Sequence, residues 1–318
     1  MNGAQERTTP LPRLPIGRYR LVFEGERLEN RDSYWGSAWR GLLGSSLKRL
    51  VCITRLEECP PCFLYRSCIF PYVFLTPPPP GAVKLPGYVA APHPFVLIPG
   101  AAAEGAVELG LTLFGMANRY LAYLVHALRD GARQGLRKRT GPLTLVAVEQ
   151  ESSPGSADWR PILDPAGGLQ PLATPPAVWP EAPGRIRLEL HTPLRLRIRN
   201  ELVGAEHMEF SIFFVNLLRR ISLLSYFHTD EPLETDFKGL AARARLVRFE
   251  QAGLSWRDWT RYSSRQETKL KMGGLIGSLV LNLEGKEEFW PYLWLGQWTH
   301  AGKGTSMGLG RYSVHTLA

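Results

Sequence analysis

The sequence has no apolar run long enough to cross a membrane, which takes about 18 to 20 residues. The N-terminal stretch MNGAQERTTP also lacks the apolar core of a signal peptide. We therefore expect a cytoplasmic protein without a membrane partner. Hydrophobic residues make up 44% of the 318 residues and charged residues 21%, which excludes disorder of the whole chain and predicts about two domains.

Acidic residues are fewer than basic residues. The chain has 29 Asp and Glu residues against 38 Lys and Arg residues, a formal net charge of +9. An excess of positive charge favours a polyanionic partner such as nucleic acid over a small neutral ligand.

Cysteine is rare, and all four cysteines lie in one short window. Cys52, Cys59, Cys62 and Cys68 follow the spacing C-x6-C-x2-C-x5-C. This clustering argues against a disulfide framework spread over an intracellular fold. The C-x2-C step is typical of metal sites, but the paired C-x2-C steps of common zinc ribbons are missing. Two interpretations stay open: a structural metal site such as zinc, and four small buried thiols in a loop-rich insertion.

Proline and glycine divide the chain. Four consecutive prolines, Pro77 to Pro80, exclude a helix or a central strand and predict a stiff connector. This connector closes an insertion over about residues 52–92. Residues 152–184 are dense in Pro, Gly and Ala and show no sustained period. We therefore predict an N-terminal domain over residues 1–184 and a C-terminal domain over residues 185–318.

Hydrophobic periodicity predicts the same order of elements, β-α-β-β-α-β, in both halves. The first half has expected strands at 17–28, 93–99, 106–114 and 143–149 and helices at 33–51 and 116–137. The second half has an alternating strand over 185–199, a helix over 210–224, strands at 254–262, 275–283 and 312–316, and a helix at 289–299. This pattern predicts an α+β fold of two tandem ferredoxin-like domains, each with one sheet face free for a ligand.

A glycine-rich loop before the last strand is the most specific motif. From Gly302 to Gly310 the glycines follow G-x-G-x3-G-x-G, and Lys303 and Arg311 add positive charge. Glycine permits a positive φ and close approach, so consecutive amides can converge on a phosphate oxygen. The alternative interpretation is a glycine-rich connection between a helix and a strand.

Two nucleotide-cofactor motifs do not fit this loop. A P-loop needs glycine where Gln297 stands and Ser or Thr where Gly304 stands. A dinucleotide fingerprint needs a third glycine where Met307 stands. No small-molecule cofactor is therefore expected.

Together with this loop, several stretches resemble the CRISPR precursor-RNA processing endoribonucleases of the RAMP superfamily. These are YWGSAWRG at residues 34–41, the cysteine segment, RYSSRQ at 261–266 and MGGLIG at 272–277. Their order is similar to the subgroup with a cysteine-containing N-terminal insertion. The resemblance implies cleavage of CRISPR repeat RNA without a catalytic metal. In that reaction a 2′-hydroxyl attacks the adjacent phosphate, leaving a 2′,3′-cyclic phosphate and a 5′-hydroxyl, and the enzyme retains its product.

The catalytic residues are harder to assign, because many members of the family place a histidine in or near the first helix. Here no histidine precedes His93, and His93, between two prolines, is expected only to shape a turn. We predict that Arg40 holds the scissile phosphate, that Tyr34 donates a proton and that His300 shuttles protons. The alternatives are a solvated helix face and a histidine that caps a helix end.

Basic side chains on predicted strands and the glycine loop form the expected RNA surface. The predicted RNA-binding residues are Lys48, Arg195, Arg197, Arg199, Arg261, Arg265, Lys269, Gly302, Lys303, Gly304, Thr305, Ser306, Gly308, Gly310 and Arg311. A charged solvent face is the alternative. The alternative function is a non-catalytic RAMP subunit that binds guide RNA among other CRISPR effector subunits.

Overall fold

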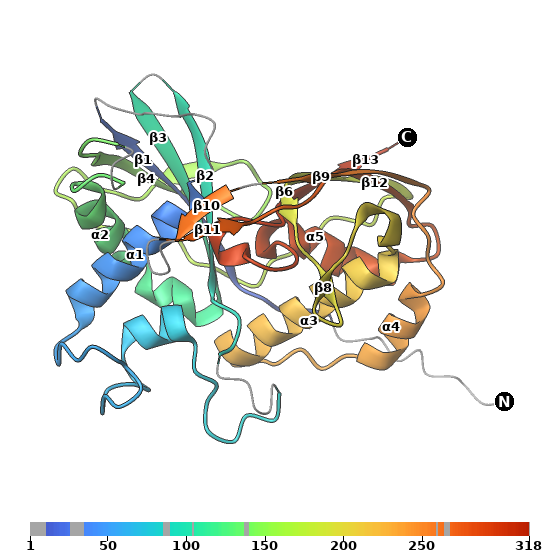
Figure 1. The fold of residues 1–318 in the computed structure, drawn as a ribbon, viewed down its shortest axis with the longest axis horizontal. Helices are drawn as coiled ribbons and strands as arrows, with labels where there is room; N and C mark the ends of the chain where they lie inside the picture. The colour runs from blue at the N-terminus through green and yellow to red at the C-terminus, as the bar shows by residue number, and fades with distance from the viewer. Residues whose placement is uncertain are drawn as a thin grey trace.

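Two antiparallel sheets lie side by side, each with helices packed on one face (Figure 1). The computed structural model describes residues 11–25, 35–84, 90–103, 105–136, 140–258, 260–263 and 268–317, and it describes no side chains for 101–103, 260–263 and 268–271. Both sheets have the strand order of the ferredoxin-like fold, in which the first and third strands lie in the centre.

The N-terminal sheet has the order β2-β3-β1-β4-β5. Its central strand β1 forms because apolar and polar residues alternate, so that Tyr19, Leu21 and Phe23 are buried on one face. Helix α1 buries Trp39 and Leu43 at helical spacing against the same core. The elements are β1 (Ile16–Glu24), α1 (Gly36–Val51), the π-helical turn η1 (Pro71–Leu75), β2 (Phe95–Ala103), β3 (Ala106–Phe114), the 3₁₀ helix η2 (Gly115–Tyr120), α2 (Leu121–Ala132), β4 (Thr144–Glu151) and β5 (Trp159–Pro161).

The C-terminal sheet has the order β13-β6-β12-β9, with α3 and α5 beneath it (Figure 1). Its elements are β6 (Arg185–Leu194), β7 (Arg197–Ile198), β8 (Glu201–Leu202), η4 (Ala205–His207), α3 (Phe210–His228), α4 (Phe237–Ala244), β9 (Gln251–Arg257), β10 (Thr260–Ser263), β11 (Thr268–Lys271), β12 (Gly274–Asn282), η5 (Glu287–Phe289), α5 (Trp290–Thr299), η6 (Thr305–Met307) and β13 (Tyr312–Thr316). Strands β10 and β11 pair as a hairpin outside the sheet.

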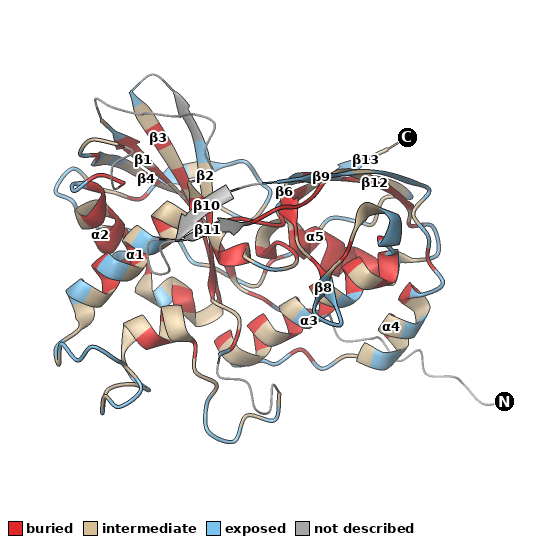
Figure 2. Ribbon diagram, in the orientation of Figure 1, coloured by how far each residue is buried: buried red, intermediate tan, exposed pale blue. Residues whose placement is uncertain are grey.

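Each half has its own hydrophobic core, and the buried residues line the contacts between helices and sheets (Figure 2). The C-terminal core also takes in Leu14, Val96 and Phe114 from the N-terminal half. In addition, the amide of Ala177 donates to the carbonyl of Leu14, which ties the segment between the sheets back to the start of the fold. The two halves therefore share part of one core.

Helix α3 is long and apolar enough to cross a membrane by composition alone. It packs instead as a core helix, since Phe213, Phe214 and Leu217 are completely buried beneath the C-terminal sheet.

Several predicted elements differ from the observed ones. The predicted helix over 116–137 begins as the 3₁₀ helix η2 and becomes α-helical only at Leu121. The alternation over 185–199 continues through Ile198, but the strand ends at Leu194, and Arg199 and Asn200 adopt positive φ in the β7–β8 turn. Helix α4 was not predicted because it has only eight residues, of which Phe237 and Leu240 are the only large apolar ones.

Candidate active site

Arg40 lies where the two halves meet. Its helix α1 and strand β2 both pack against η6, the single helical turn inside the glycine-rich loop. The guanidinium Nε of Arg40 donates to Ser306 Oγ at 3.2 Å, and its Nη2 lies 2.8 Å from His93 Nε2. The Phe74 ring lies 5.3 Å from the guanidinium carbon. Arg40 therefore links the N-terminal half to the glycine-rich loop.

His93 is the residue that sequence reasoning missed. Its ring packs edge-on against Phe74 and Phe95 and bonds to the backbone of Phe74. Burial and the nearby positive charges of Arg40 and Arg220 lower the pKa of His93 to about 3, so the ring is neutral at pH 7. The Pro-His-Pro sequence signals a fixed backbone here, but it cannot show that α1 packs against it.

A second histidine holds the His93 loop in place. The buried His228 of α3 has its Nε2 2.8 Å from the carbonyl oxygen of Pro92 and its Nδ1 3.2 Å from the hydroxyl of Tyr72. Only a protonated Nε2 can donate to a carbonyl, so Nδ1 accepts from Tyr72. Burial lowers the pKa of His228 to about 4, which keeps this neutral tautomer at pH 7.

His300 does not reach the surface. Its side chain is fully buried, and its Nδ1 lies 3.2 Å from the carbonyl oxygen of Leu309. Burial, with the nearby charges of Arg220 and Arg311, lowers the pKa of His300 to about 3. The predicted proton shuttle at His300 is therefore not supported, because a buried ring has no access to RNA. His300 caps α5 through its backbone, with a φ of 58° and its amide bonded to the Gly296 carbonyl, whereas its ring does not bond to a carbonyl of the last turn as the alternative interpretation expected.

The glycine-rich loop is held mainly by its own protein contacts. The amides of Gly302, Lys303 and Gly310 donate to Asn216 Oδ1, the Arg195 carbonyl and the Pro193 carbonyl. Those of Met307, Gly308 and Leu309 are bonded within the loop, and Arg311 N donates to Thr192 Oγ1. The prediction that the loop amides as a group bind phosphate is wrong for these residues. Residues 304–306 form the tip of the loop.

Charge is available on both sides of the loop tip. Lys303 and Arg311 are exposed, whereas Thr305 and Ser306 are nearly buried beside α1. Arg220 of α3 is half-buried and donates from Nε to the Thr299 carbonyl at 2.6 Å. Desolvation lowers the pKa of Arg220 to about 9. The site is therefore strongly electropositive.

The other predicted RNA-binding residues are spread over several places. Arg197 and Arg199 are exposed at the β7–β8 hairpin, while Arg195 donates from Nη1 to the Gly273 carbonyl. Lys48 lies at the far end of α1 and donates to the Glu57 carbonyl. Arg261 and Lys269 belong to the β10–β11 hairpin, for which no side chains are described, and Tyr34 and Arg265 lie outside the described residues. These residues stay predictions.

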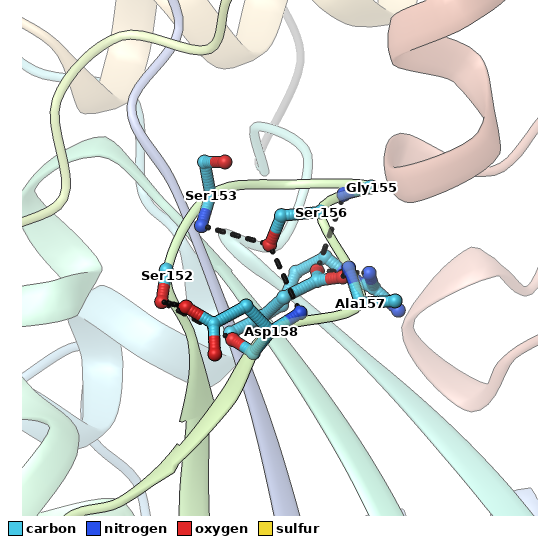
Figure 3. Close-up of polar contacts among 8 residues, drawn as sticks. Ser152, Ser153, Gly155, Ser156, Ala157 and Asp158 are labelled. Carbon is cyan, nitrogen blue, oxygen red and sulfur yellow. Dashed lines mark hydrogen bonds and ion pairs between the residues drawn. The ribbon is translucent and has the colours of Figure 1, made fainter.

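An interdomain joint next to the site was also missed. Arg18 of β1 pairs with the buried Glu151 and lies 4.0 Å from the centre of the Trp298 ring of α5. Glu151 also accepts the amides of Gly155 and Ala157, which holds the turn over residues 152–158 (Figure 3). This joint fixes α5, and with it the start of the glycine-rich loop, against the N-terminal sheet.

The four cysteines are free, half-buried thiols that line one small cavity. Burial raises the pKa of Cys59, the nearby Lys48 charge lowers it, and the other three thiols raise it, so the four groups lie close enough to interact. Within the described part of the chain, no group of three or more His, Cys, Asp or Glu residues is arranged to hold a metal ion. The predicted structural zinc stays a prediction.

Family comparisons agree with this architecture. Residues 188–312 match the family model of the CRISPR-associated endoribonuclease Cas6, and residues 14–175 match a separate model described as an N-terminal domain. The C-terminal half of the chain therefore resembles the Cas6 endoribonucleases, in agreement with the resemblance that the sequence motifs indicated, and the matching region contains the glycine-rich loop.

Solved Cas6 structures share the fold over nearly the whole chain. A Cas6 product complex (TTHB231) matches with a TM-score of 0.55 and 16% identity over 95% of this chain and 99% of that one. A second Cas6 product complex (TTHA0078) matches with a TM-score of 0.53 and 17% identity over 95% and 100%. A partial Cas6-RT-Cas1–Cas2 complex matches with a TM-score of 0.53 and 15% identity over 96% of this chain and 47% of that one. The tandem ferredoxin-like fold is confirmed. Curated protein sequences give no match.

Proposed function

We propose that this Cas6-family endoribonuclease cleaves CRISPR repeat RNA by attack of a 2′-hydroxyl on the adjacent phosphate, without a catalytic metal. The products would carry a 2′,3′-cyclic phosphate and a 5′-hydroxyl. The observation that carries the proposal is the position of Arg40, which contacts both His93 and Ser306. A phosphate bound there would meet residues from both halves of the chain.

Arg40 supplies the positive charge. A guanidinium stays protonated, binds phosphate oxygens in a bidentate manner and stabilises the extra charge of the phosphorane transition state. Ser306 Oγ, 3.2 Å from Arg40 Nε, is placed to donate to a phosphate oxygen when the guanidinium turns toward the RNA. The site is therefore best suited to stabilising the negative charge on the phosphorane in the transition state.

His93 is the proposed proton acceptor. It is neutral at pH 7 and therefore able to accept, but a pKa of about 3 makes it a weak base. A bound phosphate would offset the positive charge of Arg40, which is one cause of that low pKa. The pKa of His93 would then rise toward its ordinary value. His93 thus becomes a better base when the substrate is in place. The proton donor for the leaving 5′-oxygen remains the predicted Tyr34.

Product retention would rest on the basic residues around the loop. Lys303 and Arg311 flank the tip, and Arg197 and Arg199 extend the charge along the C-terminal half. Each phosphate contact that releases a counterion makes affinity depend on salt. We propose that the processed RNA stays bound at low salt and dissociates as salt rises.

Partner proteins belong to the same proposal. A chain of the partial Cas6-RT-Cas1–Cas2 complex resembles this chain in fold over 47% of its length. We propose that this chain, too, works together with other CRISPR proteins.

The test is incubation of the purified chain with repeat RNA in EDTA. We expect one cut with a cyclic-phosphate end, and we expect His93→Gln to slow single-turnover cleavage by about 10²–10⁴-fold with little change in RNA affinity. His126→Gln is the matched control, because His126 lies half-buried on α2, where its Nε2 is 3.0 Å from Asp130 Oδ2 and far in sequence from the Arg40 contacts. Tight binding of uncut RNA by the unmodified chain would favour the alternative, a subunit that only holds guide RNA.

A further inference from the structure

Arg220 is a charged residue next to the active site that the proposed reaction does not use. Its Nε donates to the Thr299 carbonyl at 2.6 Å, whereas its Nη2 is fully buried and has no hydrogen-bond partner in the described part of the chain. Desolvation is the only cause of its low pKa of about 9, so no carboxylate among the described residues pairs with it. Arg220 is therefore a desolvated positive charge at pH 7, and no described residue acts as its counter-ion.

Such a charge is costly for the folded chain. Moving a cation out of water costs free energy, which an opposite charge or a full set of hydrogen bonds can offset. The Thr299 carbonyl gives Arg220 one hydrogen bond, and the buried Nη2 has none. A ligand that brings negative charge close to Arg220 would offset this cost.

Helix α3 holds Arg220 at the start of the glycine-rich loop. Asn216 and Arg220 are four residues apart, so both lie on the same face of the helix. Asn216 Oδ1 accepts from the amide of Gly302 at 2.8 Å, and Arg220 binds the carbonyl of Thr299 at the other end of the same short segment. The position of Arg220 relative to the loop is therefore fixed by two side chains of one helix.

The charge of Arg220 also acts on the histidine of the site. After burial and Arg40, Arg220 is the next cause of the low pKa of His93. Arg40 reaches the same histidine from the other half of the chain, with its Nη2 2.8 Å from His93 Nε2. His93 thus lies in the field of two guanidinium groups, one from α1 and one from α3. A phosphate bound at Arg40 would lie in that field as well.

We propose that Arg220 is the second positive charge of the active site and that the phosphate of bound RNA is its counter-ion. This inference rests on the proposed function, which places the scissile phosphate at Arg40. Arg220 acts on the phosphate through its field and does not have to touch it, because charges interact strongly where little water separates them. Its role is to bind RNA and not to transfer a proton.

The two arginines would then have different tasks. Arg40 contacts Ser306 and is placed to bind phosphate oxygens directly. Arg220 is held by Thr299, and its Nη2 is buried, so its charge stays in place with or without RNA. A charge that is in place before the substrate arrives needs no reorganisation on binding. We therefore expect Arg220 to contribute mainly to RNA affinity.

Two substitutions separate the charge of Arg220 from its hydrogen bond. Arg220→Gln removes the charge but keeps a donor, because the side-chain nitrogen of glutamine follows the same number of carbons as arginine Nε. Arg220→Lys keeps the charge and moves the donor one atom farther along the side chain. The probe is repeat RNA in which the 2′-hydroxyl at the cleavage site is replaced by hydrogen, so that the RNA binds but is not cut.

The charge predicts a definite order of affinities. We expect Arg220→Gln to weaken binding by about tenfold or more at about 50 mM salt, and to lower the slope of log affinity against log salt by about 0.7–0.9, the value for one phosphate. Arg220→Lys should bind within about threefold of the unmodified chain. The reverse order, which the hydrogen bond alone would produce, or equal binding by all three proteins, would overturn the proposal.

Arg219→Gln is the matched control. It removes the same charge from an exposed position on the same helix, where solvent screens it, and should change affinity by no more than about threefold. A loss as large as that of Arg220→Gln would show that net charge and not the buried position matters, and would contradict the proposal. Thermal unfolding shows whether each variant is folded.

A change in the RNA tests the same point without any substitution. A methylphosphonate at the cleavage site removes the phosphate charge, and we expect the unmodified chain to bind this RNA about tenfold or more weakly. Arg220→Gln should then have little further effect. Equal affinity of the unmodified chain for both RNAs would overturn the role of Arg220. Binding of cleavable repeat RNA without any cut would contradict the proposed reaction but not this role.

Discussion

Arg40 is the residue whose replacement tests the active site most directly. We expect Arg40→Gln to slow RNA cleavage by about 10²–10³-fold, because the charge that stabilises the transition state is lost. RNA affinity should fall much less, since the other basic residues remain. Single-turnover cleavage at saturating enzyme, with binding measured separately, gives both quantities.

Arg49 supplies the matched control for Arg40. It lies on the same helix, is exposed, and donates to Ser46 Oγ at 3.3 Å. Arg49→Gln removes the same charge from α1 without touching His93 or Ser306. If both variants lost activity equally, the net charge of the helix rather than the Arg40 contacts would explain the effect.

Three histidines with lowered pKa values make stability depend on pH. The folded-state pKa values of His93, His228 and His300, about 3, 4 and 3, all lie below the ordinary value of 6.5. As pH falls below 6.5, these histidines become protonated in the unfolded chain but stay neutral in the folded chain. The free energy of unfolding is therefore highest above pH 6.5 and decreases below it. At one pH unit below 6.5 we expect a loss of about 1.4 kcal/mol for each histidine, or about 4 kcal/mol together.

Urea unfolding at pH 7.5, 6.5 and 5.5 measures this dependence. A free energy of unfolding that stays constant down to pH 5.5 would contradict the neutral state of these three rings in the folded protein.

Sequence patterns placed Arg40 on a polar helix face, but they did not place His93 beside it or the ring of His300 in the core. The spacing on the first helix shows a polar face opposite the Trp39 and Leu43 stripe, and that face carries Arg40. His300 stood next to the most specific motif, yet its ring points into the core, and His93 came from a segment distant in sequence. Neither fact follows from local spacing, because each depends on how the two halves pack.

Among the elements, the glycine-rich loop shows how strictly glycine is required. Gly310 has a φ of 67°, and a Cβ atom there would collide with the Ala301 carbonyl oxygen. We expect Gly310→Ala to lower the free energy of unfolding by about 2 kcal/mol or more, since backbone strain adds to the collision. Gly41→Ala is the control, because nothing lies within 4 Å of a Cβ at that exposed helical position. There we expect a gain of about 0.5–1 kcal/mol, with thermal unfolding as the measurement for both variants.

The same loop shows what the motif alone could not decide. Glycine density indicated positive φ correctly at four positions, Gly302, Gly304, Gly308 and Gly310. It did not reveal that six of the amides bond to protein acceptors, three within the loop and three to Pro193, Arg195 and Asn216. A closely approaching carbonyl and a phosphate oxygen make the same demand on the backbone. By contrast, the strands and long helices were predictable, since their apolar residues repeat with periods of two or about 3.6.

At the scale of the whole molecule, the Arg18 joint holds the two halves in register. The side chain of Glu151 is 2% exposed and that of Arg18 is 18% exposed. Arg18→Met would leave Glu151 buried without its partner, which costs about 3–5 kcal/mol. We expect Arg18→Met combined with Glu151→Gln to be less destabilising than Arg18→Met alone, because glutamine removes the charge and keeps an acceptor for the turn amides. Urea unfolding of the single and double variants measures the difference, and a cost below about 1 kcal/mol for Arg18→Met would show that the pair is solvated.

The shared core has a consequence for how such chains can be recombined. Leu14, Val96 and Phe114 belong to the first half by sequence but to the second half by packing. In a chimera that joins the first half of this chain to the second half of a distant relative, these three side chains would pack against residues of different volume. This mismatch would remain even if each sheet kept all of its own residues. Fragments cut at the segment between the sheets should accordingly be recovered together, as a complemented pair, more readily than either one alone.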